Sequence, residues 1–250
     1  MGKTVTIDAF PDSVYRHLSR SAIVCVDILA YTTVAVTAVA RGRRVFMAAD
    51  DREAEELRAT VPGSLVLAGD SAWMSLEALD VPGDRSPVIL TERPCSDLLT
   101  NCRDAEAVYV SCLRNSKATA AWLSSRYDDI AVIAAGQGFD FRCDDRLGAA
   151  RLARELTTSG FSLLGQGAAQ LVKYWGSADP GVIALGRSAR DANRSGRSED
   201  VRFVQSHVDD LDVVCRCRGN EILPAHVEPG TTNTQQGLGR SSTVVGESGR

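Results

Sequence analysis

The sequence has few of the features that mark nucleic-acid-binding or membrane proteins. Its 28 basic residues are scattered among 32 acidic ones, the formal net charge is −4, and no long basic run occurs. Proteins that bind DNA or RNA concentrate Lys and Arg on one face. Residues 21–40 carry no charge apart from Asp27, but an aspartate at the centre of a span costs about 2.5 to 3.5 kcal/mol, and the threonines of this segment weaken a span further. We therefore expect neither a nucleic-acid nor a membrane partner.

Several catalytic signatures are also missing. There is no P-loop and no G-x-S-x-G nucleophile motif. The only histidines, His17, His207 and His226, neither cluster nor show the spacing of metal ligands. A phosphatase of the Asp-x-Asp type would need an acid two residues after Asp27, where Leu29 stands. These absences argue against P-loop nucleotide hydrolysis, serine-type acyl transfer and histidine-based zinc chemistry.

The cysteines do not form a recognisable framework. Seven is an odd number, their spacing is irregular, and no secretory leader precedes them. This usage favours free thiols in a reducing compartment, so we expect a cytoplasmic protein. Cys215 and Cys217 form a C-x-C pair, but no second pair completes a zinc set. We interpret the cysteines as small buried hydrophobic residues.

The remaining composition is that of a globular protein with an extensive core. Of 250 residues, 44% are hydrophobic and 24% are charged. Short β-branched runs alternate with helical patterns, which predicts a layered α/β/α fold with a largely parallel or mixed sheet. The predicted strands are 22–28, 43–48, 64–68, 87–91, 106–112 and 129–135, followed by a hairpin around 218–220.

Helical signals occupy the segments between these strands. Asp50 followed by Glu53 resembles a capping box, and the apolar spacing from Leu147 to Leu156 predicts a helix that ends at Gly160. Further helices are predicted at 115–126, 165–175 and 179–193, and a loop at 71–86. We expect one domain over 1–227, with two packed halves, about 1–113 and 114–227, as the alternative. The tail, 228–250, is predicted to be disordered.

Asp27 is the first candidate functional residue. It follows a buried strand and precedes a helix, and ligands bind at this edge of open α/β sheets. A buried carboxylate also needs a metal, a cation or hydrogen-bond donors. The alternative is an aspartate that caps the next helix or pairs with a buried arginine. Burial alone does not decide between a site and this structural role.

A second group of acids, Asp140, Asp144 and Asp145, follows the strand at 129–135. If that strand is parallel to the one before Asp27, these acids emerge at the same edge, and Asp70 would be a further strand-end acid. Carboxylates from separate strand ends are typical Mg²⁺ ligands. Gly136 and Gly138 could offer backbone N–H groups to an anion. The alternative is a solvated first turn of a helix, where acids are favoured by the helix dipole.

Several motifs, taken in order, carry a family resemblance. Asp27-Ile28-Leu29-Ala30-Tyr31-Thr32-Thr33-Val34 resembles Asp-Val-Leu-Arg-Ala-Thr-Thr-Thr, and Gly69-Asp70-Ser71 resembles Gly-Glu-Arg. Residues 135–150 resemble Ala-Gly-Arg-Glu-Gly followed by Glu-Asp and a small-residue helix. Asn115 matches a Ser-Leu-Leu-Asn-Ala segment, and 186–203 a Gly-Arg and Asp-Val segment. Over about 21–224 the chain thus resembles the 2-phosphosulfolactate phosphatase (ComB) family.

This resemblance implies a function and a site. Members are Mg²⁺-dependent enzymes that remove phosphate from 2-phospho-3-sulfolactate. The resemblance implies catalytic roles for Asp27, Asp144 and Asp145, with Asp70 as an additional Mg²⁺ ligand beside these three. It implies that the substrate is bound by Thr32, Thr33, Asn115, Gly136, Gly138 and Arg187.

Departures from the motifs predict a changed substrate. Ala30, Ser71, Gln137 and residues 93–95 replace groups that would hold phosphate or sulfonate, each charge-assisted contact being worth roughly 1.5 to 3 kcal/mol. Candidate replacements are Arg93, Lys117, Arg142, Arg146 and Arg187, although each of them taken alone is more often a solvated surface charge. We therefore expect a Mg²⁺-dependent phosphatase that acts on a small anionic phosphate monoester, and a homodimer is compatible with this expectation. The alternatives are an inactive binding or accessory protein, or a divergent enzyme that uses the metal for another reaction on a small acid.

Overall fold

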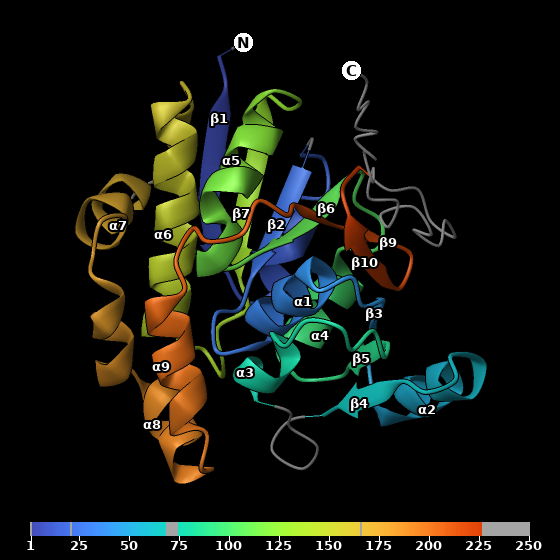
Figure 1. Ribbon diagram of the computed structural model, residues 1–250. Coiled ribbons are helices and arrows are strands. Elements are labelled where there is room, and N and C mark those ends of the chain that lie inside the picture. Colours follow the sequence, from blue (N-terminus) through green and yellow to red (C-terminus); the bar gives the residue numbers. More distant parts are fainter. Residues whose placement is uncertain (1, 21, 69–74, 166, 227–250) are drawn as a thin grey trace, which may run out of the picture.

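The computed structural model describes residues 2–20, 22–68, 75–165 and 167–226. Ten strands of these segments form one mixed sheet (Figure 1), in the order β4-β5-β3-β10-β9-β6-β2-β7-β1-β8. The predicted layered α/β fold is therefore confirmed. The strands are β1 (Thr4–Ala9), β2 (Ala22–Val26), β3 (Val45–Met47), β4 (Leu65–Leu67), β5 (Val88–Leu90), β6 (Val108–Ser111), β7 (Asp129–Ala134), β8 (Ser162–Leu164), β9 (Cys215–Arg218) and β10 (Glu221–Pro224).

The sheet consists of two parallel groups joined by a hairpin. Strands β6, β2, β7, β1 and β8 are mutually parallel, and so are β3, β5 and β4. The hairpin β9–β10 lies between them and pairs antiparallel with β6 on one side and β3 on the other. Because the direction reverses at each of these pairings, the two parallel groups run in opposite senses.

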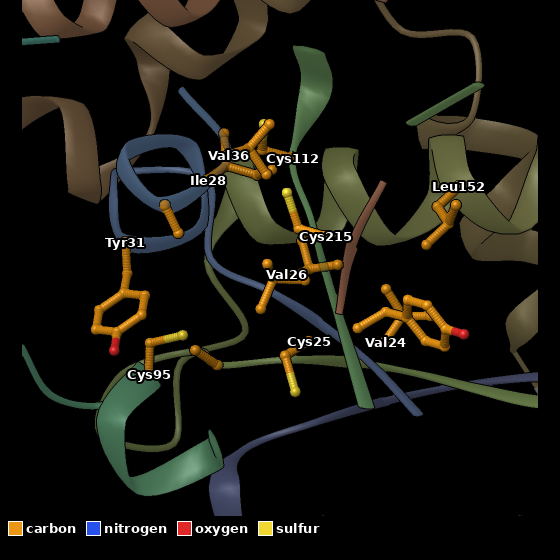
Figure 2. Packing of buried hydrophobic residues seen from close by; sticks show 14 of the residues in the cluster. Val24, Cys25, Val26, Ile28, Tyr31, Val36, Cys95, Cys112, Leu152 and Cys215 are labelled. Atoms are coloured by element: carbon orange, nitrogen blue, oxygen red, sulfur yellow. The ribbon is translucent and has the colours of Figure 1, made fainter. Parts of the chain in front are cut away.

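Helices cover both faces of the sheet. Alternate residues of a strand face opposite sides, and Cys25 of β2 lies 3.7 Å from Cys102 at the end of α4, whereas Val26 faces Gly148 of α6. Figure 2 shows β2 residues packed among side chains of α1, α4 and α6. The helices are η1 (Pro11–Arg16), α1 (Tyr31–Ala40), α2 (Asp51–Thr60), α3 (Leu76–Leu79), α4 (Cys95–Asn101), η3 (Leu113–Asn115), α5 (Ser116–Ser124), α6 (Cys143–Thr158), α7 (Ala168–Trp175), η4 (Pro180–Leu185), α8 (Arg187–Arg194) and α9 (Ser198–Ser206).

The six predicted strands and the hairpin are confirmed, with shorter bounds. Two strands were missed. In β1, Thr4, Thr6 and Asp8 alternate with apolar residues, a strand pattern that a search for continuous apolar runs passes over, and β1 pairs with β7 along its full length. With only three residues, β8 is too short to show a period. The capping role of Asp50 is also confirmed, because its side chain accepts a hydrogen bond from the Glu53 N–H over 2.8 Å.

Two expectations about helices need correction. The predicted loop at 71–86 contains α3, because Leu76 and Leu79 are both fully buried and Ser75 caps the turn. The helix predicted at 179–193 is two helices, η4 and α8, separated by Gly186, whose backbone is extended. Residues 71–74 and the tail predicted to be disordered, 228–250, lie outside the described residues.

The sheet crosses the boundary proposed between two halves. Strand β2, which precedes residue 113, pairs with β7, which follows it, and β9–β10 separates β3 from β6. The division into domains stays a prediction. All seven cysteines are free thiols, and five of them are buried. Within the described residues, no helix combines the length and apolar character needed to cross a lipid bilayer.

Candidate active site

Asp27 directly follows β2 in a turn held by two threonines. The Thr32 hydroxyl donates to the Asp27 carbonyl over 2.7 Å and lies 3.1 Å from the Asp27 N–H, which donates to it. The Thr33 hydroxyl donates to the Ile28 carbonyl over 2.8 Å. Both threonines are buried, so their hydroxyls hold the backbone that carries the Asp27 carboxylate. Their predicted contact with substrate stays a prediction.

Asp145 joins three structural elements. It lies in the first turn of α6, and its carboxylate accepts hydrogen bonds from the Ile28 N–H over 3.1 Å and the Gly136 N–H over 2.9 Å. It therefore connects α6 to the residues that follow β2 and β7. This requires a close approach, because a Cβ on Gly148, one turn further along α6, would lie 2.5 Å from Ile28. The predicted convergence of the ends of parallel strands β2 and β7 is confirmed.

Asp144 lies beside it with an incompletely satisfied carboxylate. The side chain is buried, and its Oδ1 has no hydrogen-bond partner. Burial raises the pKa of Asp144 above its ordinary value, although hydrogen bonds with the Ser188 side chain and the Leu29 backbone oppose the shift. A buried carboxylate oxygen without a donor carries a desolvation cost that a cation can offset.

The acids influence one another. Burial raises the pKa of Asp27 well above its usual range, and the nearby charges of Glu92 and Asp144 raise it further. Burial likewise raises the pKa of Asp145, with additional contributions from Asp144 and Asp27, despite the two backbone donors. We refer to Asp27, Glu92, Asp144 and Asp145 as the acidic cluster. Several carboxylates that lie close together and are shielded from water are typical of functional sites.

Glu92 is the member of the cluster that sequence reasoning missed. It follows β5, and β5 belongs to the parallel group that runs opposite to β2. A signal was present, since Thr91-Glu92 ends a predicted strand in the same way as Asp27. Asp70 lies outside the described residues. Its predicted place among these acids stays a prediction.

A cavity of about 470 Å³ lies next to the cluster and contains mostly polar side chains. We refer to it as the polar cavity. Glu92 lines it directly, as do Leu29, two residues from Asp27, and Ser188, the partner of Asp144. Its complete lining is Leu29, Thr91, Glu92, Arg93, Gln137, Ser188, Asp191, Ser195 and Arg197. A separate cavity of about 560 Å³ between α2, α4 and the β9–β10 turn contains none of the predicted site residues.

Comparison with known proteins identifies the family. The family model for 2-phosphosulpholactate phosphatase matches residues 9–220. The chain belongs to this family. A relative from Caldanaerobacter subterraneus subsp. tengcongensis, named probable 2-phosphosulfolactate phosphatase, is 27% identical over 222 residues, covering 83% of this chain and 92% of the relative. Membership of the 2-phosphosulpholactate phosphatase family indicates a phosphatase, that is, a phosphoric monoester hydrolase.

Three other positions of the family motifs differ in whether their polar groups are already hydrogen-bonded. Asn115 is fully buried, where its side chain accepts from the Cys112 N–H over 3.0 Å and donates to the Val213 carbonyl over 3.0 Å. The Gly136 N–H is already bonded to Asp145, whereas a Cβ on Gly138 would meet open space. These bonds give Asn115 and Gly136 structural roles, and their contacts with substrate stay predictions.

The candidate cationic replacements differ in position. Arg93 lines the polar cavity, and so does Arg197, which sequence reasoning did not single out. Arg142 is buried and bonds Gln137 and Asp191, which are both part of the lining. Arg187 is the neighbour of the lining residue Ser188 and pairs with Asp140 over 3.5 Å. The remaining two, Lys117 and Arg146, are not among the residues that line this cavity.

The residues present fit a divalent cation in part. Among the described residues, no three His, Cys, Asp or Glu side chains form a group arranged to hold a metal ion. Mg²⁺, however, is commonly bound by one or two carboxylates and keeps several waters. Such an ion would give the Asp144 Oδ1, which has no hydrogen-bond partner, a cation to bind. It would also reduce the electrostatic repulsion between Asp27 and Asp144. Asp145 is less available, because both of its oxygens accept backbone hydrogen bonds.

Proposed function

We propose that this chain is a Mg²⁺-dependent phosphatase that hydrolyses a small anionic phosphate monoester, with a preference shifted away from 2-phosphosulfolactate. The observation that carries the proposal is the acidic cluster beside the polar cavity, in which burial and the neighbouring acids raise the pKa values of Asp27 and Asp145. Family membership supports the class of reaction. The replaced motif positions support the shift in substrate, because Ala30 is a buried, uncharged residue and Gln137 stands where the family motif has charged side chains.

Asp27 and Asp144 are the residues we assign to the metal. When bound, Mg²⁺ supplies Lewis acidity toward a phosphoryl oxygen and orients water. Asp145 acts as a positioning residue, because its two hydrogen bonds hold the end of β2 and the end of β7 against α6. Asp70 remains a further candidate ligand outside the described residues.

The walls of the polar cavity supply the contacts to substrate. Arg93 and Arg197 offer guanidinium groups, which bind phosphate or carboxylate through paired hydrogen bonds. Arg93 is exposed and pairs with Asp97 over 3.3 Å, an interaction that a phosphate group can replace. Glu92 lines the cavity next to Asp27, where it is placed to accept a proton from an attacking water.

Phosphate release tests the proposal. We expect hydrolysis of one or more 2-phospho acids with Mg²⁺, none with a chelator, and a fall of at least about 100-fold in Asp27→Asn and Asp144→Asn. Asp51→Asn is the matched control, because Asp51 is an exposed acid in the first turn of another helix, α2. Its activity should equal that of the wild type. Circular dichroism should show that all variants are folded.

Three outcomes would contradict the proposal. Unchanged turnover in Asp27→Asn would refute the site assignment. Mg²⁺ binding by calorimetry without release of phosphate from any ester would favour another reaction in the same site. Absence of both would favour a binding or accessory protein.

Two further expectations are also proposals. Free thiols throughout the chain agree with a cytoplasmic location. A homodimer would be detected by light scattering coupled to size-exclusion chromatography.

A further inference from the structure

A second cavity adjoins the polar cavity at the same edge of the sheet. It has a volume of about 400 Å³ and lies between the residues that follow β1, those that follow β7, and α4. Gln137 lines both cavities, and the neighbours Arg93 and Pro94 line one cavity each. We refer to this second space as the aromatic cavity. Its lining is Phe10, Pro11, Asp12, Pro94, Asp97, Thr100, Asn101, Ala135, Gln137, Gly138 and Phe139.

Two phenylalanines of the aromatic cavity have unusual backbone conformations. Phe139 has φ = 64° and Phe10 has φ = 75°, in a region that residues other than glycine seldom adopt. Phe139 lies at the tip of a tight turn closed by two backbone hydrogen bonds. The Gln137 N–H donates to the Asp140 carbonyl over 3.0 Å, and the Asp140 N–H donates to the Gln137 carbonyl over 2.9 Å. Backbone strain of this kind persists mainly at functional sites.

Phe139 is almost entirely exposed. Its relative accessibility is 98%, the largest among the exposed large hydrophobic residues of the described part of the chain. Phe10, by contrast, is half-buried and packs against Gly136, where a Cβ would lie 2.7 Å from its ring. The turn therefore holds one phenyl ring in solvent at the margin of a cavity already lined by another. A single exposed hydrophobic residue needs no explanation, but Phe139 lines the same cavity as Phe10, so the two rings are available to one bound group.

The two cavities differ in charge. Arg93 and Arg197 line the polar cavity, whereas no Lys, Arg or His is among the residues that line the aromatic cavity. Its charged residues are Asp12 and Asp97, which disfavour an anionic group. A molecule that spans both cavities would place its anionic end near Arg93 and Arg197 and an uncharged end between Phe10 and Phe139.

We propose that the aromatic cavity is a specificity subsite for an uncharged aromatic or branched aliphatic group of the substrate. The inference rests on the proposed phosphatase function and names its substrate class. The preferred ester carries its phosphate, and any carboxylate, at one end and an apolar group about the size of a phenyl ring at the other. Small esters that are anionic at both ends are disfavoured.

Binding of two phosphonates tests the subsite without requiring turnover. With Mg²⁺ present, benzylphosphonate should bind the wild-type chain at least about tenfold more tightly than methylphosphonate in calorimetry, because a phenyl ring is removed from water. In Phe139→Ala the ratio should fall to within about threefold, and Phe139→Leu should retain an intermediate ratio. Since Phe139 is exposed, both variants should keep the wild-type thermal midpoint.

Tyr174→Ala is the matched control, because Tyr174 is a largely exposed aromatic residue on α7 that lines neither cavity. It should leave the ratio unchanged. Equal affinity for the two phosphonates, no binding of benzylphosphonate, or an unaltered ratio in Phe139→Ala would overturn the subsite.

Turnover separates this inference from the proposed function. The wild type should release phosphate from 2-phospho-3-phenyllactate with a lower KM than from 2-phospholactate, and Phe139→Ala should raise only the first KM. If no ester is hydrolysed but benzylphosphonate is still selected through Phe139, the proposed reaction fails and the subsite stands. If esters are hydrolysed without regard to the phenyl group, the reaction stands and the subsite fails.

Discussion

Two groups of charges in this protein, each built around buried residues, have opposite electrostatic characters. In the acidic cluster, the pKa values of Asp27, Asp144 and Asp145 are raised, with burial as the largest cause. The second group is centred on Arg114, which is 2% exposed and bonds Asp210 over 2.7 Å and Asp80 over 3.0 Å. Here the charges are opposite in sign. Burial opposes the ionisation of Asp80, but hydrogen bonds from Arg41 and Arg114 outweigh it and hold its pKa below the ordinary value.

The difference separates structural from functional use of buried charge. Arg114 also donates to the Thr37 hydroxyl over 3.0 Å, so its guanidinium joins α1 to the segments that contain Asp80 and Asp210. Every charge in that group has a partner. In the acidic cluster, the Asp144 Oδ1 has none. Removing one partner from a fully paired group destabilises the fold, because the other charge is left uncompensated, whereas a group of like charges lowers stability and is retained for what it binds.

The largest expected effect is on the Arg114 group. Arg114→Ala leaves Asp80 and Asp210 without their buried partner, and we expect a loss of about 3 kcal/mol in the free energy of unfolding by urea. Arg41→Ala is the control, because Asp80 keeps Arg114 and Arg41 is more exposed; its loss should stay below about 1 kcal/mol. Similar small losses in both variants would remove the distinction drawn between the two groups.

A second prediction concerns the packing that supports the acidic cluster. A Cβ on Gly148 would lie 2.5 Å from Ile28 and 2.9 Å from Val26, so Gly148→Ala should push α6 away from β2. We expect a loss of about 1 to 2 kcal/mol in stability, because overpacking outweighs the gain in helix propensity. Phosphatase activity should fall as well, since Asp145 would lose its bond to Ile28. In the double variant Gly148→Ala/Ile28→Val, the Ile28 methyl group that the new Cβ contacts is removed, so part of the stability and part of the activity should return.

Neutralising Asp27 in the acidic cluster should raise the stability of the fold, by less than Gly148→Ala lowers it. Without metal, Asp27→Asn removes a charge that repels Glu92 and Asp144, so the urea midpoint should rise. Asp145→Asn should lower it instead, because an amide nitrogen would face a backbone N–H that now donates to the carboxylate. If Asp27→Asn proved destabilising, Asp27 would be a structural residue like Asp80.

The smallest expected effect is a pH dependence in the Arg114 group. The pKa of Asp80 is lower in the folded chain than its unfolded value of about 3.9. Its contribution to stability is therefore present above the unfolded pKa and lost as pH falls through the folded one. The stability difference between wild type and Asp80→Asn should be constant from pH 7 to 5 and shrink toward pH 3. A difference that grew in acid would contradict this assignment.

Much of the architecture could be predicted from local patterns. Six strands, the β9–β10 hairpin and the ends of β2 and β7 were recognisable because their apolar runs stop at polar or glycine residues. Asp27, Asp144 and Asp145 could be placed at one edge, since parallel neighbouring strands end together. Glu92 could not, because β5 belongs to the oppositely directed group and its approach to Asp27 depends on pairings distant in the sequence. That Phe10 and Phe139 line one cavity could not be predicted for a similar reason, since their turns meet only beside α4.

The sequence by itself determined the periodicity of the helices and strands, the residue types available at each strand end, and membership of a phosphatase family. Only the tertiary structure decided which acids converge, which arginine is fully paired, and which cavities adjoin. The physical reason is range. Hydrophobic periodicity is a property of neighbours along the chain, whereas desolvation and the charge felt by a carboxylate come from whatever the fold packs around it.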